Sequence, residues 1–341
     1  MDPRTTARRL YFTGPGTVEI VERPRPAPGE GEVLVESRLS AISPGTEGLI
    51  YRGEAPTELE ADEGIDALEG DLSFPLSYGY AVVGRVIEVG DGVDDGWLDR
   101  RVFAYNPHES HFLASPEELL VVPEEVSTER ATLFANVETA VSFLLDGRPA
   151  IGERVAVFGQ GVVGLLTTAL LAGTQIDRLL AVDRIGPRRR LAGELGADLT
   201  VDPDEEAPAS VLERTAGDRA DLAYELSGNP DALDDAIAAT GFGGRVVVGS
   251  WYGTKPATVS LGGRFHRDRI ELRSSQVSTI APEHEGRWSR SRRREVAWRR
   301  LAELPVDGLV SHELPLEEAP AAYRLIEERP EEAVCVLFRY D

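Results

Sequence analysis

The segment Gly159-Gln160-Gly161-Val162-Val163-Gly164 constrains the fold of this chain more than any other stretch. Apolar residues 155–158 precede it directly and the mainly apolar run 162–173 follows, which predicts a strand, a tight turn and a helix. In such a unit the glycines permit the turn, let a pyrophosphate approach the backbone and let helix and strand pack closely. The free N–H groups that open the helix then hold the pyrophosphate. The residues predicted to contact a dinucleotide here are Gly159, Gly161, Val162, Val163 and Gly164.

An acidic residue, Asp183, ends the next apolar stretch, residues 179–183. It lies about 20 residues beyond the glycines, where a carboxylate binds the ribose hydroxyls of a dinucleotide. Such a carboxylate repels a 2′-phosphate, so the sequence favours NAD over NADP. Arg184 and Arg188 lie nearby, and their guanidinium groups could hold a phosphate, so NADP remains an alternative.

Uncharged strands alternate with helical stretches through residues 125–264, a pattern that predicts a parallel sheet covered by helices on both faces. The predicted strands are 155–158, 179–183, 222–225 and 245–249, and the predicted helices are 127–146, 162–173, 187–195 and 230–240. The fold class is therefore α/β, with a doubly wound parallel sheet.

Residues 1–124 are rich in short apolar stretches separated by Gly and Pro, which predicts a small β-barrel. Within them, the acidic residues 54–72 are expected to form a surface excursion. The last segment, 265–341, contains a basic helix and ends in an apolar stretch, 333–338. We expect that stretch to be a strand that returns to the first domain.

The charge balance is strongly acidic, with 59 Asp and Glu against 36 Lys and Arg and a net charge of -23. This excess disfavours nucleic acid as a partner, because phosphate binding needs a basic face. Dispersed carboxylates favour a host that accumulates salt, although an ordinary acidic protein is an alternative. No apolar run reaches the ~20 residues of a membrane helix, and we expect a cytoplasmic protein without a signal peptide.

Cysteine and histidine limit the metal chemistry. Cys335 is the single cysteine, which excludes an internal disulfide and a multi-cysteine zinc site. His108 and His111 form the nearest approach to a ligand cluster, and two histidines in a loop are more often ordinary polar residues.

The chain resembles the medium-chain dehydrogenase/reductase superfamily over nearly its whole length. The resemblance rests on the glycine segment and on residues 43–47, 79–84, 225–228 and 243–249. Residues 265–267 and 274–277 are similar to the subgroup labelled bacteriochlorophyllide- or threonine-dehydrogenase-like. The resemblance implies a GroES-like β-barrel catalytic domain over 1–124, a Rossmann domain over 125–264, and a return to the catalytic domain over 265–341. It also implies a substrate site between the two domains.

The resemblance fails at the zinc ligands. The positions that match them hold Pro44, Tyr80-Ala81 and, less closely, Ala135, none of which is a good zinc ligand. The four-cysteine structural zinc lobe of the family has no counterpart. We therefore expect no catalytic zinc.

Four residues are candidates to handle the substrate proton without a metal. By resemblance, Tyr80 stands at a ligand position and Thr46 matches the proton-relay hydroxyl, with Glu47 beside it. His108 is chosen for its chemistry, since imidazole exchanges protons near neutral pH. Each has a structural alternative: a turn for Thr46, core filling for Tyr80, a helix cap for Glu47 and a solvated turn for His108. Expected cofactor contacts further along the chain are Thr139, Ser227 and Gly249.

These features predict a zinc-independent oxidoreductase that transfers hydride between NAD and an alcohol/carbonyl pair. One alternative is an NADPH-dependent enone or quinone reductase, and another is a dinucleotide-binding protein without catalysis. We expect a small-molecule substrate and, by family analogy, a homodimer.

Overall fold

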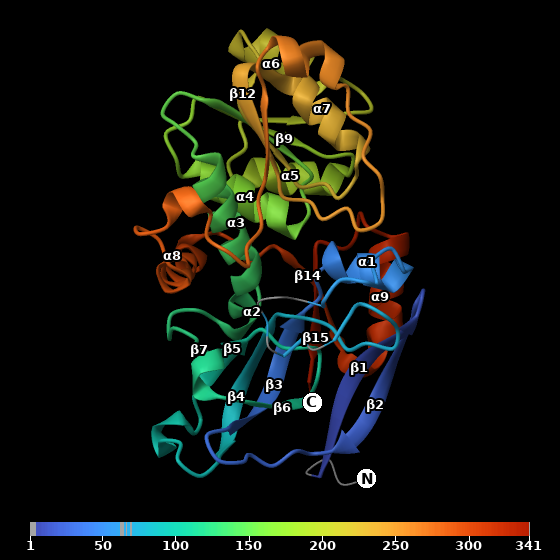
Figure 1. Ribbon diagram of the computed structural model, residues 1–341, viewed down its shortest axis with the longest axis vertical. Helices are drawn as coiled ribbons and strands as arrows, with labels where there is room; N and C mark the ends of the chain where they lie inside the picture. The colour runs from blue at the N-terminus through green and yellow to red at the C-terminus, as the bar shows by residue number, and fades with distance from the viewer. Residues whose placement is uncertain (1–4, 62–64, 66, 69, 341) are drawn as a thin grey trace. The chain divides into compact units, whose positions relative to one another are not determined.

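The computed structural model describes residues 5–61, 65, 67–68 and 70–340, and the chain divides into two compact units. Unit 1 combines the residues up to Ala135 with those from Asp307 onward, and unit 2 is the continuous stretch Asn136–Val306. Figure 1 shows the elements of both units.

Unit 2 is built on a six-stranded sheet in which all strands are parallel. Its strands are β8 (Arg154–Phe158), β9 (Arg178–Val182), β10 (Leu199–Val201), β11 (Ala220–Glu225), β12 (Thr240–Val248) and β13 (Glu271–Ser274). The order β10-β9-β8-β11-β12-β13 is the doubly wound 3-2-1-4-5-6 arrangement, which confirms the predicted fold class. In such a sheet, ligands bind at the carboxyl ends of the strands where the order reverses, here beside β8 and β11.

Helices cover both faces of this sheet because successive strand side chains point to opposite sides. Val155 and Val157 of β8 pack with Phe143 and Leu171, whereas Phe158 packs with Leu212. The helices and short helical turns are α3 (Phe134–Gly147), α4 (Val162–Ala172), α5 (Gly186–Glu194), α6 (Pro208–Ala216), α7 (Asp231–Ala239), α8 (Arg290–Glu303), η3 (Leu261–Phe265) and η4 (Pro282–His284).

Unit 1 is β-rich, as predicted. Its strands are β1 (Thr6–Gly14), β2 (Thr17–Pro24), β3 (Val33–Ala41), β4 (Val82–Val89), β5 (Arg101–Ala104), β6 (His111–Ala114), β7 (Leu120–Val121), β14 (Val310–Pro315) and β15 (Cys335–Arg339). Its helices and short turns are α1 (Thr46–Arg52), α2 (Thr128–Ala131), α9 (Ala319–Glu328), η1 (Asp95–Trp97), η2 (Pro116–Glu118) and η5 (Leu316–Glu318). The seven-stranded sheet has the order β14-β15-β3-β4-β5-β7, and β6 pairs with β3.

The end of the chain completes the sheet of unit 1. β15 pairs antiparallel with β3, Leu337 lying opposite Ala41, and β14 runs parallel to β15. The predicted returning strand is therefore present. The predicted segment 265–341 starts too early for this return, because β13 pairs with β12 and belongs with α8 to unit 2.

Two local expectations differ from the structure. The helix predicted over 127–146 is two helices, because the Thr132 hydroxyl bonds the Glu129 carbonyl and α2 ends there. The predicted surface excursion 54–72 buries Ala55, Leu68 and Leu72 in the core of unit 1. Residues 62–64, 66 and 69 of this stretch lie outside the described residues. No helix among the described residues is long and apolar enough to cross a membrane.

Candidate dinucleotide site and polar site

The glycine turn of unit 2 has the geometry that its sequence predicts. Gly159 has a φ of +87°, and a Cβ there would lie 2.5 Å from the Ser227 Cα. A Cβ on Gly164 would lie 1.9 Å from the Gly159 carbonyl oxygen, so only glycine lets α4 approach the turn. Around Gly161 the space is open, and this residue caps α4 without a side-chain hydrogen bond. The first N–H groups of α4, at Val162 and Val163, therefore remain suited to an anion.

Asp183 follows β9 and lies beside this turn. Its carboxylate accepts hydrogen bonds from the Gln160 N–H at 2.6 Å and from the Ile185 N–H at 2.7 Å. These bonds fix the carboxylate next to the glycines, at the position where the ribose of a dinucleotide is recognised.

Two of the arginines after Asp183 have acidic partners. Arg184 pairs with Asp204 at 3.1 Å, and Arg189 pairs with Asp202 at 2.8 Å. Arg188 lies half-buried on α5. Acidic partners offset part of the positive charge that a 2′-phosphate would need.

The loop after β11 is held by a residue for which the sequence predicts no role. Glu225 is fully buried, and its carboxylate accepts bonds from the Ser227 N–H and hydroxyl and from the Tyr252 hydroxyl. Burial and the neighbouring Glu225 raise the pKa of Tyr252, which keeps its hydroxyl a donor. The Gly249 N–H bonds the Glu225 carbonyl at 3.0 Å. Ser227 and Gly249 are thus placed together beside the glycine turn.

In unit 1, Glu47 and His108 meet in a buried polar network. Both side chains are 0% exposed, and Glu47 Oε2 lies 3.0 Å from His108 Nε2. The Tyr323 hydroxyl donates to the same oxygen at 2.5 Å, and the Ser43 N–H donates to Oε1 at 2.8 Å. On its other side, His108 Nδ1 lies 2.7 Å from the Ser40 hydroxyl.

The directions of these bonds follow from donor chemistry. A carboxylate only accepts, so His108 Nε2 carries a hydrogen that it donates to Glu47, and the Ser40 hydroxyl lies at hydrogen-bond distance from His108 Nδ1. The Tyr340 hydroxyl lies 2.8 Å from that of Ser40. Burial raises the pKa of Tyr340 and, together with Glu47, that of Tyr323, so both hydroxyls remain donors. The network runs from Tyr340 through Ser40 and His108 to Glu47.

Tyr80 lies at the more exposed part of this region. Its side chain is half-buried, and its hydroxyl donates to the Ser43 hydroxyl at 2.5 Å. Ser43 therefore contacts both Tyr80 and Glu47.

The predicted acid–base residues are thus only partly together. Glu47, Tyr80 and His108 are linked through their contacts with one another and with Ser43, whereas Thr46 lies half-buried at the first position of α1. Glu47 and His108 are fully buried in this structure, so their side chains are not exposed to solvent. Thr139 lies half-buried on α3 in unit 2. Ser40, Ser43, Tyr323 and Tyr340 were missed, because only tertiary structure brings the two tyrosines here.

Metal ligands do not cluster in the described part of the chain: no three His, Cys, Asp or Glu side chains there form a group suited to an ion. His108 and His111, the nearest approach to a ligand cluster in the sequence, have different hydrogen-bond partners. His108 bonds Ser40 and Glu47, whereas His111 Nδ1 bonds Ser110.

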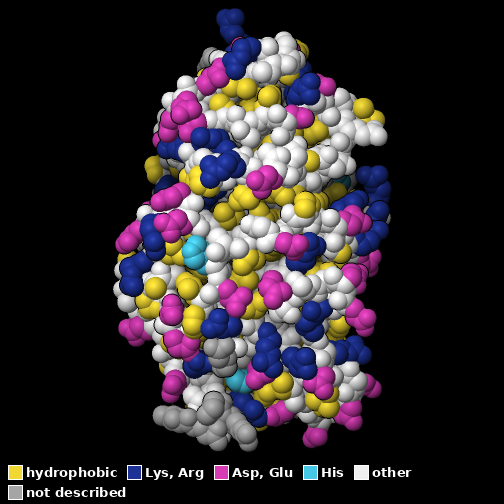
Figure 2. All heavy atoms as spheres, turned by 180° about the vertical axis from the view of Figure 1, so that it is seen from behind, with side chains coloured by type: hydrophobic (Ala, Val, Ile, Leu, Met, Phe, Trp, Pro, Cys, Tyr) yellow, Lys and Arg dark blue, Asp and Glu magenta, His cyan; other side chains and the backbone are white. Residues whose placement is uncertain are grey.

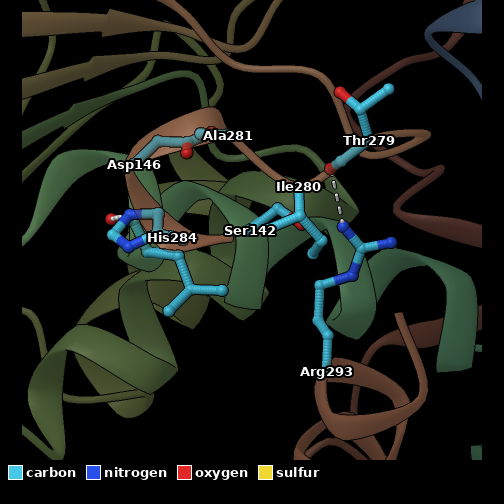
Figure 3. A pocket seen from close by; sticks show the side chains of 8 residues that line it. Ser142, Asp146, Thr279, Ile280, Ala281, His284 and Arg293 are labelled. Carbon is cyan, nitrogen blue, oxygen red and sulfur yellow. Dashed lines mark hydrogen bonds between the residues drawn. The ribbon is translucent and has the colours of Figure 1, made fainter. Parts of the chain in front are cut away.

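A small polar hollow of unit 2 lies between α3 and residues 279–293 (Figure 3). Arg293 donates to the Thr279 carbonyl and pairs with buried Glu138 at 3.0 Å. His284 Nε2 bonds the Leu145 carbonyl, while His284 Nδ1 and the Ser142 hydroxyl have no partner among the described residues. The hollow has room for roughly one water molecule, so it is no substrate pocket.

The profile of the family described as zinc-binding dehydrogenase matches residues 162–290, which lie within unit 2. Over longer alignments the chain is 25% identical to D-guloside 3-dehydrogenase of Escherichia coli strain K12, covering 96% of this chain and 98% of that protein. It is 29% identical to (R,R)-butanediol dehydrogenase of Bacillus subtilis strain 168, covering 77% and 80%.

Solved structures share the whole fold. An alcohol dehydrogenase from E. coli CFT073, complexed with NADH, superposes with a TM-score of 0.80 at 20% identity and covers 98% of this chain and 100% of that one. The 2R,3R-butanediol dehydrogenase of B. subtilis gives a TM-score of 0.80 at 21% identity, with the same coverage. These similarities confirm the predicted fold class for both units.

Proposed function

The chain belongs to the medium-chain dehydrogenase/reductase superfamily, and on that premise we propose that it is a zinc-independent, NAD-dependent oxidoreductase of an alcohol/carbonyl pair. The observation that carries the proposal is the glycine turn with Asp183 fixed beside it, in a chain whose relatives are named dehydrogenases.

The residues of unit 2 fit a nicotinamide dinucleotide. Open space at Gly161 and the N–H groups of Val162 and Val163 suit the pyrophosphate, and Asp183 suits the adenosine ribose. When bound, the nicotinamide supplies hydride chemistry. NAD is preferred because Asp183 repels a 2′-phosphate while Arg184 and Arg189 are paired with aspartates.

We propose that no zinc takes part, on the chemistry of the side chains. Pro44 and Ala135 offer no donor atom, and a neutral Tyr80 is a poor ligand. The two nearby side chains of ligand type, Glu47 and His108, already bond each other, Tyr323 and Ser40. A zinc ion finds no ligand set among these residues. The zinc-binding family profile begins at residue 162, beyond all of them.

In this proposal the side chains of unit 1 handle the substrate proton. Tyr80 exchanges that proton, because its side chain is only half-buried and its hydroxyl is hydrogen-bonded to Ser43. Glu47 and His108 hold the surrounding backbone from inside the unit.

Turnover with a panel of secondary alcohols, polyols, hydroxy acids, aldehydes and enones, each with NAD(H) and NADP(H), tests the function. Oxidation of alcohols with NAD by a protein with well under one zinc per chain is the expected result. Reduction of enones with NADPH alone would favour the reductase alternative, and NADH binding without any turnover would favour a non-catalytic protein. One zinc per chain that is needed for activity would contradict the metal-free proposal.

Three further properties belong to the proposal. Acidic side chains are spread over the face shown in Figure 2, which supports adaptation to salt inside the cell. Loss of the folded structure in dilute buffer tests this adaptation.

β13 is the edge strand of the sheet of unit 2, and Leu272 on it is 39% exposed, which supports a homodimer through that edge. Light scattering tests the dimer. The partner in the reaction is a small molecule.

A further inference from the structure

Ser43 begins the segment 43–47 that carries the resemblance, but the sequence assigns no role to its side chain. Its hydroxyl accepts the hydrogen bond of Tyr80, and it is only 9% exposed. A hydroxyl group can accept one hydrogen bond while it donates another. Ser43 can therefore take the Tyr80 proton in the same event in which Tyr80 takes a proton from a substrate.

The backbone of Ser43 is fixed by Glu47 from both directions. The Ser43 N–H donates to Glu47 Oε1 at 2.8 Å, and the Glu47 N–H donates to the Ser43 carbonyl at 2.9 Å. These two bonds close a turn over residues 44–46 and orient the serine hydroxyl toward Tyr80.

Glu47 is in turn held by groups from distant parts of unit 1. Tyr323 of α9 and His108 both bond its Oε2, and Ser40 of β3 bonds the far side of His108. A Cβ on Gly79 would lie 2.9 Å from the His108 ring, so the residue before Tyr80 also packs on this network. Removal of any one partner would leave a buried polar group unsatisfied, so the arrangement is rigid.

We propose that Ser43 and Tyr80 form the proton-relay pair of the reaction, and that Glu47, His108 and Tyr323 are positioning residues that hold Ser43. This inference rests on the proposed oxidation of an alcohol. The substrate O–H proton moves to the Tyr80 oxygen, the Tyr80 proton moves to the Ser43 oxygen, and the Ser43 proton leaves to water. One proton is thus released to solvent for each hydride removed from the carbinol carbon.

Single and double variants test the pair. We expect Tyr80→Phe to lower kcat by about 10² to 10⁴ and Ser43→Ala by about 10 to 10², since general acid–base catalysis contributes on this scale. The double variant is no slower than Tyr80→Phe, because the two hydroxyls act as one unit. Ser43→Thr keeps the hydroxyl and restores most of the activity. NADH titration by fluorescence, which reports on unit 2, is unchanged in all four.

A proton inventory in mixtures of H₂O and D₂O reads the relay directly. In the native protein, kcat should depend on the fraction of D₂O along a curve, as expected when more than one proton moves in the rate-limiting step. In Ser43→Ala the same plot should be a straight line. Ser110→Ala is the control, since it removes a buried hydroxyl that bonds His111 outside the network and leaves kcat and the inventory unchanged.

The opposing results are distinct. Full kcat and an unchanged inventory in Ser43→Ala, with Tyr80→Phe inactive, would overturn the relay while the proposed function stands. If the native protein oxidised no alcohol, both the relay and the proposed function would be overturned. If Ser43→Thr lost as much kcat as Ser43→Ala, while its thermal unfolding stayed unchanged, the proposed role of the Ser43 hydroxyl in the relay would be contradicted.

Discussion

Tyr323 on α9 donates a hydrogen bond to Glu47 on α1, across 276 positions of the sequence. Both side chains are fully or almost fully buried. This bond ties the C-terminal part of unit 1 to the turn that holds Ser43.

Tyr323→Phe removes that bond and leaves the aromatic packing against Phe12 and Tyr51 in place. The buried carboxylate loses a donor, and we expect the free energy of unfolding to fall by about 1–3 kcal/mol. Urea denaturation followed by circular dichroism measures this. Tyr11→Phe, at a partly exposed tyrosine of β1, is the control and should unfold like the native protein.

Gly164→Ala should abolish NADH binding, because its Cβ would overlap the Gly159 carbonyl and push α4 away from the turn. Gly193→Ala is a matched control: this glycine lies in α5 with nothing within 4 Å of its Cβ. Alanine there should leave binding unchanged and stabilise the helix by about 0.5–1 kcal/mol. Fluorescence titration with NADH measures both, and native-like binding by Gly164→Ala would contradict the assigned site.

Asp183→Ala should raise the NADP to NAD ratio of kcat/KM by about tenfold, since roughly 1.4 kcal/mol of repulsion corresponds to that factor. It should also weaken NAD binding, because the Gln160 N–H loses its fixed acceptor. Asp198→Asn is the control, as Asp198 accepts the Leu179 N–H at the other end of β9. An unchanged ratio in Asp183→Ala would argue against a ribose contact.

The contact between Asp221 and Arg154 should make the stability of unit 2 depend on pH. Burial raises its pKa, but hydrogen bonds from Arg154 and the arginine charge outweigh burial and lower it overall. A carboxyl with a lowered folded pKa stabilises above its unfolded pKa of about 3.9, and that contribution disappears as pH falls through the folded value. We expect Asp221→Asn to cost about 1 kcal/mol at pH 7, because the pair is partly exposed, and nothing in strong acid.

Thermal unfolding between neutral and acid pH measures this difference. Asp218→Asn serves as the control, since Asp218 is 67% exposed and lies 3.6 Å from the same arginine. If the loss of thermal stability in Asp221→Asn, relative to the native protein, became larger as the pH falls, the result would contradict this prediction.

Cys335 should not react with thiol reagents in the folded protein. Its side chain is 1% exposed, and burial raises the pKa of the thiol to about 12, which suppresses the thiolate. Ellman's reagent should detect one thiol per chain only after denaturation. Rapid labelling of the native protein would show that β15 opens.

The dinucleotide half of the fold could be predicted because its signals are local. Gly159 in the turn and Gly164 at the start of α4 lie within six residues of one another in the sequence, and uncharged strands between helical stretches indicate a parallel sheet. The sequence does not predict the three-residue strand β10, because three residues are too few to show a period.

The polar site of unit 1 could be predicted only in part. Tyr80 and Glu47 follow from the resemblance, whereas Tyr323 and Tyr340 reach the site because β15 pairs with β3, a contact that no local pattern encodes. The chemistry of imidazole points to His108, whereas its burial is a property of the packed core.

The pairing of β15 with β3 also sets an order of assembly. Unit 2 is continuous in sequence, so a growing polypeptide can finish its sheet while residues 307–341 are still to be synthesised. Unit 1 must wait for the last residues, which bring Tyr323 and Tyr340 to Glu47 and Ser40. A ribosome stalled before β15 would therefore carry a unit 2 with all its strands and a unit 1 whose sheet lacks β15.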